Sequence, residues 1–479
     1  MDRRKFIKTT ATAAAASFVL PRFSIAKTKS PNEKLNVAFV GVGGIGGMAI
    51  SGMKSENIAA ICDVDWNYVA RCGSFKRFKD LNLDKTPKFT DYREMLDKMG
   101  KDIDAVCIST PDHSHFKITL DCMEAGKHVA VQKPLVHNVW QCRELQKAKA
   151  YYPKLKTQMM NQGHATAQIR MLKAWYDTGV TGGVDEVHVL CGGPNWYAGK
   201  GTPYFVKPKV WPLTNDPIPE GFDYDLWLNQ AAKVPFNKTY HPLAWRGFWQ
   251  FGTGMLGDWF CHTGDAPVWI LDLKAPSKVE LITRKGDFDP TVFIPDSSVV
   301  KWTFPATDKR GEVVMYWNDG GLPMTNKPAD WDQPKPLTRG MVMFGKDHSI
   351  VTGVRPNFEP RICNKEFFQS FRRQKKDEIA AKTVPLVREN SIFCEWIDAI
   401  KGNGPECLGS FDYASQLTEV ALLGVLAQRF GGVIEWDHEK MRSPNRPELD
   451  AFLREPEREG WESSRPWDKK KSFFERLFG

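Results

Sequence analysis

One short glycine-bounded segment holds the residue types best suited to proton transfer. In GTGMLGDWFCHTGD, Asp258, His262 and Asp265 stand at positions i, i+4 and i+7, so a continuous helix would present all three on one face. An imidazole can take a hydroxyl proton near neutral pH, and a carboxylate one turn away can orient the ring and stabilise its cation. The segment therefore predicts a general base that acts on an alcohol, with a metal site or a plain interface helix as the alternatives.

A second segment has the pattern of a dinucleotide site. The apolar run 35–40 is typical of a strand buried on both faces, and GVGGIGG follows it. Gly41 allows a tight turn, Gly43 lets a pyrophosphate approach the backbone, and Gly46 lets the next helix pack closely on the strand. A second strand ends in Asp63, where a carboxylate would accept hydrogen bonds from both ribose hydroxyls and repel a 2′-phosphate. The pattern predicts NAD, with NADP less favoured; in the alternative, Asp63 merely ends a strand.

The elements that position these residues alternate between helix and strand. The pattern predicts a helix over 92–99, a strand over 104–110, a loop and helix over 111–126 and a further strand from 128. Such alternation is typical of a doubly wound parallel sheet, which binds ligands at the carboxyl ends of its strands. We therefore expect the cofactor site to be formed by Gly41, Gly43, Ile45, Gly46, Asp63, Thr110, Pro111, His115 and Lys133, with His115 holding the loop.

The second half of the chain has a different pattern of polar and apolar residues. Polar and apolar residues alternate over 184–191, 278–284, 297–304 and 312–318, which predicts an open, largely antiparallel sheet in an α+β domain. Residues 193–250, which we call the aromatic region, are too long for a plain connection and are therefore expected to be functional. Aromatic faces stack on sugars, although most of these tryptophans are expected to be core. An amphipathic helix over 412–429, ended by Gly431 and Gly432, is expected to pack at the domain interface.

The composition of the chain indicates which binding partners and which folding compartment fit the protein. Five basic residues and one acidic residue in 1–26 account for +4 of the formal net charge of +9, and the remaining charges mostly alternate in sign. Neither nucleic acid nor a membrane surface is implied. The ten cysteines form no CxxC pair. Those in apolar runs (Cys62, Cys107, Cys191 and Cys261) are expected to be buried free thiols, as in a protein folded in a reducing compartment.

The first 26 residues predict export. Arg3 and Arg4 precede Phe6, an apolar stretch over 11–20 follows, and Ser24-Ile25-Ala26 offers a cleavage point. The stretch is about half the roughly 20 residues needed to span a bilayer, so we expect a removable twin-arginine signal and a periplasmic or secreted protein without stable membrane insertion. A basic disordered N-terminus is the alternative. We divide the chain into this signal (1–26), a linker (27–34), a nucleotide domain (35–158), a substrate and oligomerisation domain (159–432) and a C-terminal extension (433–479).

Four segments together resemble one known family. GVGGIGG, STPDHSH, AGKHVAVQKPL and GTGMLGDWFCH stand in the order and spacing of the Gfo/Idh/MocA family, named after glucose-fructose oxidoreductase and inositol dehydrogenase, and the resemblance spans nearly the whole chain after the signal. It implies a Rossmann domain that binds NAD, a second domain whose open sheet commonly mediates oligomers, and catalytic roles for Lys133, Asp258 and His262. The family usually has Glu where this chain has Gln132, and a neutral amide cannot hold the lysine ammonium as a carboxylate can.

Three functions fit these features. The first is an NAD-dependent oxidoreductase acting on a secondary hydroxyl or ketone of a sugar or glycoside, with a retained cofactor because free NAD would be lost outside the cytoplasm. The second is a redox-neutral glycosidase or lyase that oxidises, eliminates and reduces again. The third is a non-catalytic cofactor-binding sensor, which the three intact catalytic residues argue against. Substrate contacts are expected from His164, Trp245 and Asp265, no metal is expected, and the open sheet is expected to form a homo-oligomer.

Overall fold

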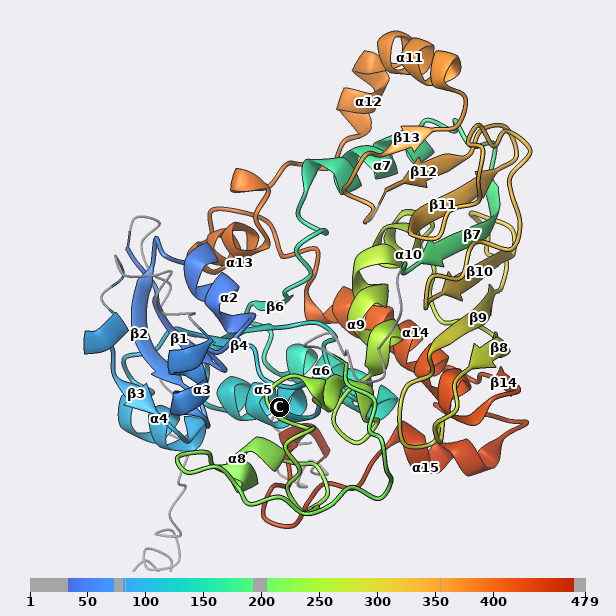
Figure 1. The fold of residues 1–479 in the computed structure, drawn as a ribbon. Helices are drawn as coiled ribbons and strands as arrows, with labels where there is room; N and C mark the ends of the chain where they lie inside the picture. Colours follow the sequence, from blue (N-terminus) through green and yellow to red (C-terminus); the bar gives the residue numbers. More distant parts are fainter. Residues whose placement is uncertain (1–32, 73–80, 82, 193–204, 354, 469–479) are drawn as a thin grey trace, which may run out of the picture.

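The computed structural model describes residues 33–468 except 73–80, 82, 193–204 and 354. Two halves lie side by side, each built around one sheet (Figure 1). The predicted signal, the start of the aromatic region and the end of the C-terminal extension lie outside the described residues.

The first half is the predicted doubly wound parallel sheet. Six strands lie in the order β3-β2-β1-β4-β5-β6, and every neighbouring pair is parallel. The strands are β1 (Asn36–Val40), β2 (Asn57–Cys62), β3 (Lys88–Phe89), β4 (Ala105–Ile108), β5 (His128–Val131) and β6 (Thr157–Met159). Their residues are mostly apolar and mostly buried, as in a sheet covered on both faces. The strand order reverses between β1 and β4, and ligands bind at such a switch point.

Helices from two distant parts of the chain cover this sheet. The connecting helices are α2 (Gly46–Gly52), α3 (Trp66–Arg71), α4 (Tyr92–Met99), α5 (His115–Glu124) and α6 (Val139–Tyr151). A further helix, α13 (Ile392–Lys401), returns from the other half, and its Ile392 and Trp396 share a core with Val37 and Phe39 of β1 (Figure 1). The nucleotide half is therefore not one continuous segment, and a division at residue 158 misses this layer.

The second half contains a mixed sheet of eight strands. Their order is β13-β12-β11-β7-β10-β9-β8-β14, and every neighbouring pair is antiparallel except β7 and β10. The strands are β7 (Val184–Leu190), β8 (Lys278–Lys285), β9 (Ser297–Phe304), β10 (Val313–Asn318), β11 (Gly340–Gly345), β12 (Ile350–Thr352), β13 (Arg361–Ile362) and β14 (Val433–Glu435). This confirms the predicted open, largely antiparallel sheet.

One long helix lies between the two sheets. The predicted terminal helix is α14 (Phe411–Phe430), which packs against α6 and β6 on one side and against α9 (Gly254–Thr263), β8 and β9 on the other (Figure 1). Trp302 of β9 donates its indole N–H to the Val420 carbonyl of α14 at 3.0 Å. The predicted place at the interface is confirmed. The predicted amphipathic character is wrong, because contacts on both sides bury nearly the whole circumference of the helix.

The remaining elements are short or peripheral. The other helices are α7 (Ala167–Asp177), α8 (Tyr224–Leu228), α10 (Asp265–Ile270), α11 (Lys365–Gln374), α12 (Lys376–Lys382) and α15 (Asp450–Leu453). Single 3-10 turns are η2 (Leu83–Lys85), η3 (Asp112–Ser114), η4 (Ala244–Gly247), η5 (Arg388–Asn390), η6 (Pro447–Leu449) and η7 (Pro466–Asp468). All ten cysteines are free and nine are buried, which confirms the prediction made for Cys62, Cys107, Cys191 and Cys261. Within the described ranges, no helix combines the length and the apolar composition that a membrane span requires.

Candidate cofactor and active site

A cavity with an empty volume of about 860 Å³ lies at the carboxyl end of the Rossmann sheet, beside the switch point. Its walls come from both halves of the chain. On the nucleotide side it is lined by Gly41, Gly43, Gly44, Ile45, Asp63, Tyr68, Thr110 and Pro111, and on the opposite side by Leu226, Trp227, Asn229, His241, Trp245 and Arg246. The predicted glycine loop and the aromatic region therefore face each other across one site.

Two positions of the glycine loop leave no room for a side chain. Gly41 has φ +78°, and a Cβ there would lie 2.7 Å from the Ser109 carbonyl oxygen. A Cβ on Gly46 would lie 2.0 Å from the Gly41 carbonyl oxygen. These are the tight turn and the close approach of helix to strand that the spacing predicts. Gly41, Gly43, Gly44 and Ile45 of this loop line the cavity, where the pattern predicts a pyrophosphate.

Asp63, directly after β2, holds the glycine loop in place by hydrogen bonds. Its Oδ2 accepts hydrogen bonds from the backbone N–H groups of Val42 at 2.9 Å and Gly43 at 3.2 Å, and its Oδ1 accepts one from Asp65 at 3.0 Å. Burial raises the pKa of Asp63, and these backbone bonds only partly oppose the rise. Asp63 also lines the cavity, so its position is compatible with the predicted contact with a ribose. That contact stays a prediction.

The aromatic region is tied down beside the cavity. His241 Nε2 lies 2.8 Å from the Asp65 carboxylate, and Phe222 stacks on the His241 ring at 4.2 Å. His113 lies in the turn after β4, and its Nε2 is 2.8 Å from the carbonyl oxygen of Trp227. Burial lowers the pKa of His113 to about 3, so its ring is neutral and serves as a structural link. The cover over the cavity is thereby joined to two loops of the Rossmann half.

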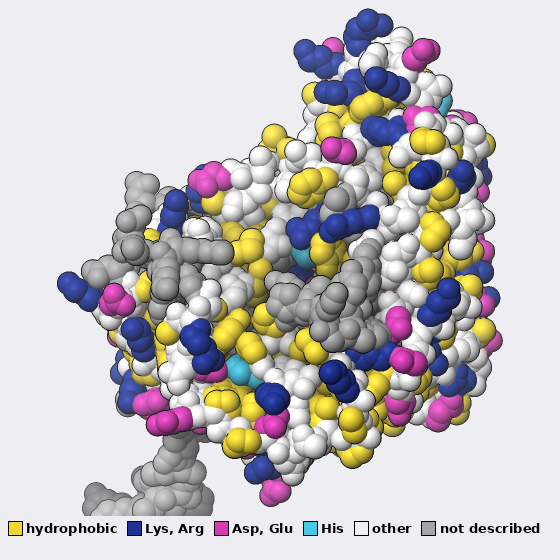
Figure 2. Space-filling model, in the orientation of Figure 1, with side chains coloured by type: hydrophobic (Ala, Val, Ile, Leu, Met, Phe, Trp, Pro, Cys, Tyr) yellow, Lys and Arg dark blue, Asp and Glu magenta, His cyan; other side chains and the backbone are white. Residues whose placement is uncertain are grey.

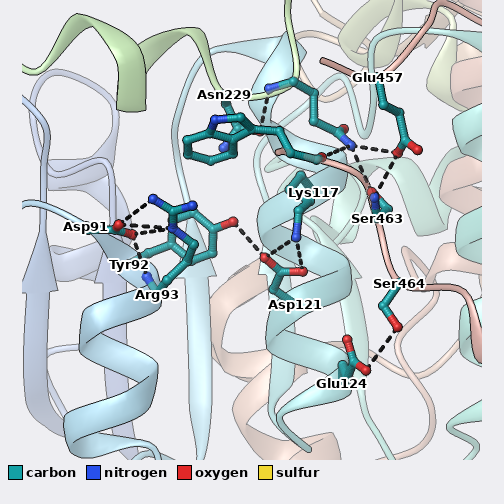
Figure 3. A network of polar contacts seen from close by, with 12 residues as sticks. Asp91, Tyr92, Arg93, Lys117, Asp121, Glu124, Asn229, Glu457, Ser463 and Ser464 are labelled. Atoms are coloured by element: carbon teal, nitrogen blue, oxygen red, sulfur yellow. Dashed lines mark hydrogen bonds and ion pairs between the residues drawn. The ribbon is translucent and has the colours of Figure 1, made fainter. Parts of the chain in front are cut away.

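Residues 457–464, which we call the C-terminal strap, close another side of the same cavity. Trp461 lines it and lies under the Arg93 guanidinium at 4.3 Å. Figure 3 shows the strap beside α5: Ser464 donates to Glu124 at 3.0 Å, and Glu457 accepts a hydrogen bond from the side chain of Gln230 in the aromatic region at 2.7 Å. Nothing in the sequence pattern of the strap indicated this role.

A partly buried ion pair lies just after the end of β5. Lys133 follows β5 as Thr110 follows β4, and these strands are neighbours. The Lys133 ammonium pairs with the Asp258 carboxylate and donates to the Asp258 carbonyl at 3.2 Å. Burial would raise the pKa of Asp258, but Lys133 and Arg246 outweigh it and hold that pKa below its ordinary value. Asp258 is therefore a carboxylate across the neutral pH range.

His262 lies one helical turn from Asp258 on α9. Burial and the positive charges of Lys133 and Arg355 lower its pKa well below the ordinary value, against the opposite effect of Asp258. Its Nδ1 is buried, with no hydrogen-bond partner among the described residues. The imidazole is therefore neutral and able to accept a proton, which is the state that a general base needs.

Asp265 does not share this helical face. Helix α9 ends at Thr263, and Asp265 begins α10 after Gly264, so the expectation of one continuous helix is wrong. The Asp265 carboxylate lies 3.0 Å from His164 Nδ1 and accepts a hydrogen bond from the Tyr413 hydroxyl at 2.7 Å. Burial opposes the cation, but Asp265 raises the pKa of His164 above its ordinary value. Asp265, His164 and Tyr413 thus form a second buried cluster, separate from the Lys133 pair.

Other predicted residues have identifiable places. His115 does not line the cavity: its ring nitrogens lie 2.9 Å from the Pro134 carbonyl and 2.8 Å from the Thr110 carbonyl, so it holds two loops together, as predicted. Trp245 lies in the wall of the cofactor cavity. Gln132 donates to the Met160 sulfur and not to Lys133, whose carboxylate partner comes from Asp258.

Two further observations concern ions. Over the described ranges, no group of three or more His, Cys, Asp or Glu side chains is placed to hold a metal.

Sequence reasoning also missed three arginines. Arg246 lines the cavity and acts on Asp258, while Arg339 and Arg355 stack on Trp259 at 5.2 and 5.0 Å.

Curated relatives share part of this chain. A glycosyl hydrolase family 109 protein 1 from Shewanella sp. (strain MR-4) is 33% identical over 144 residues, covering 28% of this chain and 30% of the relative. An alpha-N-acetylgalactosaminidase from Shewanella oneidensis is 33% identical over 142 residues, with the same two shares. The chain thus spans less than a third of the length of these relatives.

Solved structures share the fold over most of the chain. The WlbA dehydrogenase from Bordetella pertussis, in complex with NADH and UDP-GlcNAcA, has a TM-score of 0.54 at 16% identity and covers 85% of this chain and 99% of that one. An aldose-aldose oxidoreductase from Caulobacter crescentus has a TM-score of 0.52 at 15% identity, covering 84% and 100%. At these identities the likeness concerns the fold alone.

Two family models match the two halves. Residues 35–156 match the NAD-binding Rossmann fold of an oxidoreductase family, and residues 192–293 match the C-terminal alpha/beta domain of the same family. The glycine loop, the cavity at the switch point and Asp63 fit NAD, and both halves together show that the chain belongs to the Gfo/Idh/MocA oxidoreductase family.

Proposed function

We propose that this protein is an exported NAD-dependent oxidoreductase that acts on a secondary hydroxyl or ketone of a sugar or glycoside and retains its cofactor. One observation carries the proposal: the partly buried Lys133–Asp258 pair lies one helical turn from a neutral His262. Lys133 follows β5, the neighbour of β4, whose following residue Thr110 lines the cofactor cavity, although the three residues are not themselves among the lining of that cavity. A proton acceptor and a buried ammonium beside a nicotinamide are the parts that alcohol oxidation needs.

Each residue has a separate task. Bound NAD supplies the hydride acceptor. His262 takes the hydroxyl proton, because its lowered pKa keeps it neutral until then. Lys133 places a positive charge and N–H donors near the substrate oxygen, and Asp258 holds the ammonium in place from α9. In the reverse direction, the same imidazole returns the proton to a ketone.

The residues that cover the cavity support retention of the cofactor. The aromatic region and Trp461 of the C-terminal strap line the side opposite the glycine loop, and both are bonded to the Rossmann half. Release of NAD therefore requires these contacts to open. A twin-arginine signal would let the protein fold around NAD before export, and a second substrate would then reoxidise the bound NADH.

A redox-neutral glycosidase is the second candidate. It uses the same residues, and the names of the curated relatives, which match 28% of this chain, favour it. Product analysis with an aryl glycoside separates the two. A keto-glycoside supports the oxidoreductase, release of the aglycone with an unoxidised sugar supports the glycosidase, and absence of both products over a panel of sugars contradicts both.

We also propose that the open face of the second sheet joins copies of this chain into a homo-oligomer. Ile282 on β8 is 51% exposed, so its apolar side chain is accessible to a second copy of the chain. Sedimentation of the wild type and of Ile282→Lys tests this. The wild type should sediment as an oligomer that the variant weakens, and a monomeric wild type would contradict the proposal.

A further inference from the structure

Two arginines meet at one aromatic ring beside the proposed base. The guanidinium of Arg339, just before β11, lies 5.2 Å from the centre of the Trp259 ring, and that of Arg355, after β12, lies 5.0 Å from it. The Trp259 ring in turn lies 5.6 Å from the His262 ring. The two cations are therefore one aromatic side chain away from the site where a hydroxyl would lose its proton.

No carboxylate of the described residues pairs with either arginine. Three cations lie in the region of the Trp259 and His262 rings: Lys133, Arg339 and Arg355. Asp258 is the acidic group that acts on both Arg355 and His262, and it is already paired with Lys133. Asp319, which also lies near Cys191 and these arginines, is bonded to Ser298 and to the Trp317 indole. The local charge thus stays positive, and burial together with Arg339 lowers the pKa of Arg355.

The exposed edges of the arginines are available to a ligand. Arg339 is exposed and Arg355 is half-buried, and their cation–π contacts with the Trp259 ring do not use the N–H groups of either guanidinium. Figure 2 shows Lys and Arg side chains gathered beside a histidine at the central hollow of the molecule. A planar guanidinium matches the two oxygens of a carboxylate or phosphate.

The position of the arginines assigns the anion to the substrate and not to the cofactor. Both belong to the second sheet, near the end of β7, where a Cβ on Gly192 would touch Arg339. The cofactor phosphates belong at the glycine loop of the other sheet.

We propose that Arg339 and Arg355 bind an oxyanion carried by the sugar, either a carboxylate or a phosphate, so that the preferred substrate is an acidic sugar. The proposal rests on the proposed oxidation of sugars at His262. It makes the two arginines residues that determine specificity, since they select the substrate by its charge while Lys133 and His262 perform the chemistry. It also predicts that added salt weakens binding of the acidic substrate.

The experiment compares three probes on the full-length protein: glucose, glucuronate and glucose 6-phosphate, with the galactose and mannose series in parallel. Binding is measured by calorimetry and turnover by reduction of bound NAD. We expect one acidic class to bind more tightly than its neutral parent. Arg339→Met and Arg355→Met should each raise KM for that acid by roughly 10- to 100-fold, the value of a charge-assisted hydrogen bond. At a pH above the acidic limb kcat should change little, whereas Arg355→Met should also move that limb to higher pH, because the charge of Arg355 lowers the pKa of His262. KM for the neutral sugar should not move.

Controls separate this inference from the proposed reaction. Arg372→Met on α11 removes an arginine that also stacks on an aromatic ring, Phe368 at 5.7 Å, and should leave every KM unchanged. Arg355→Lys keeps the charge and should recover part of the affinity. Acid binding that depends on the arginines, without turnover of any sugar, would support the site and contradict the proposed function. Turnover of neutral sugars as efficient as that of acids, unchanged in both Met variants, would overturn the site and leave the function standing.

Discussion

The ion pair between Lys133 and Asp258 can be broken from either side. The two side chains are only 12% and 18% exposed, so Lys133→Met leaves a buried carboxylate without its partner. Removal of one member of a buried pair costs about 3–5 kcal/mol. Arg246 also acts on Asp258, so we expect the lower end, about 3 kcal/mol, for this variant. Asp258→Asn leaves the ammonium without a carboxylate and should cost at least as much.

The same two variants should move the pH profile in opposite directions. After burial, the charge of Lys133 contributes most to the low pKa of His262, whereas Asp258 raises it. Lys133→Met therefore raises the pKa of the base, and the acidic limb of kcat/KM shifts to higher pH. Asp258→Asn lowers that pKa, and the limb shifts to lower pH. Both should reduce turnover above the limb by on the order of 100-fold, since each disturbs a positioned proton-transfer site.

Urea unfolding and sugar-dependent NADH formation are the assays. Lys98→Met is the control, because Lys98 forms an exposed pair with Glu94 on α4 and should keep wild-type stability and activity. In the double variant, Lys133→Met with Asp258→Asn, the loss of stability should be smaller than the sum of the single losses. Additive losses, or pH limbs that shift in the same direction, would refute this account of the pair.

Three other predictions concern the cofactor and export. Asp63→Ala should narrow the preference for NAD over NADP in binding titrations, because a carboxylate repels the 2′-phosphate; a wild type that prefers NADP would show that Asp63 does not face the ribose. Trp461→Ala should speed the loss of NAD during dialysis, since it removes one wall of the cavity, and unchanged retention would exclude the strap from cofactor binding. Changing Arg3 and Arg4 both to Lys should leave the protein inside the cell, and continued export would mean that another route is used.

The local parts of the site could be predicted because local rules govern them. The glycine spacing fixes a turn between one strand and one helix, and Asp63 ends the adjacent strand, so both follow from patterns over some thirty residues. Lys133 follows a recognisable strand, and Asp258 and His262 are one turn apart on a single helix. The break at Gly264, which sends Asp265 to His164, could not be predicted from the 3.6-residue period alone.

The distant parts could not be predicted because they depend on tertiary contacts. Trp461 reaches the cofactor cavity from the last described segment, and α13 enters the core of the Rossmann half from about 350 residues beyond β1. Arg339 and Arg355 meet only because the turns beside β11 and β12 bring them to the ring of Trp259. No residue period or short motif relates such positions in the sequence.

The retained cofactor can be tested directly on mature protein purified from the exported fraction. After extensive dialysis, the protein is given a sugar, or a pair of sugars that can exchange a hydride, without added NAD. The account predicts that NAD or NADH remains bound and that each protein molecule forms product many times. A protein that emerges empty, and that oxidises sugar only with stoichiometric free NAD, would contradict it.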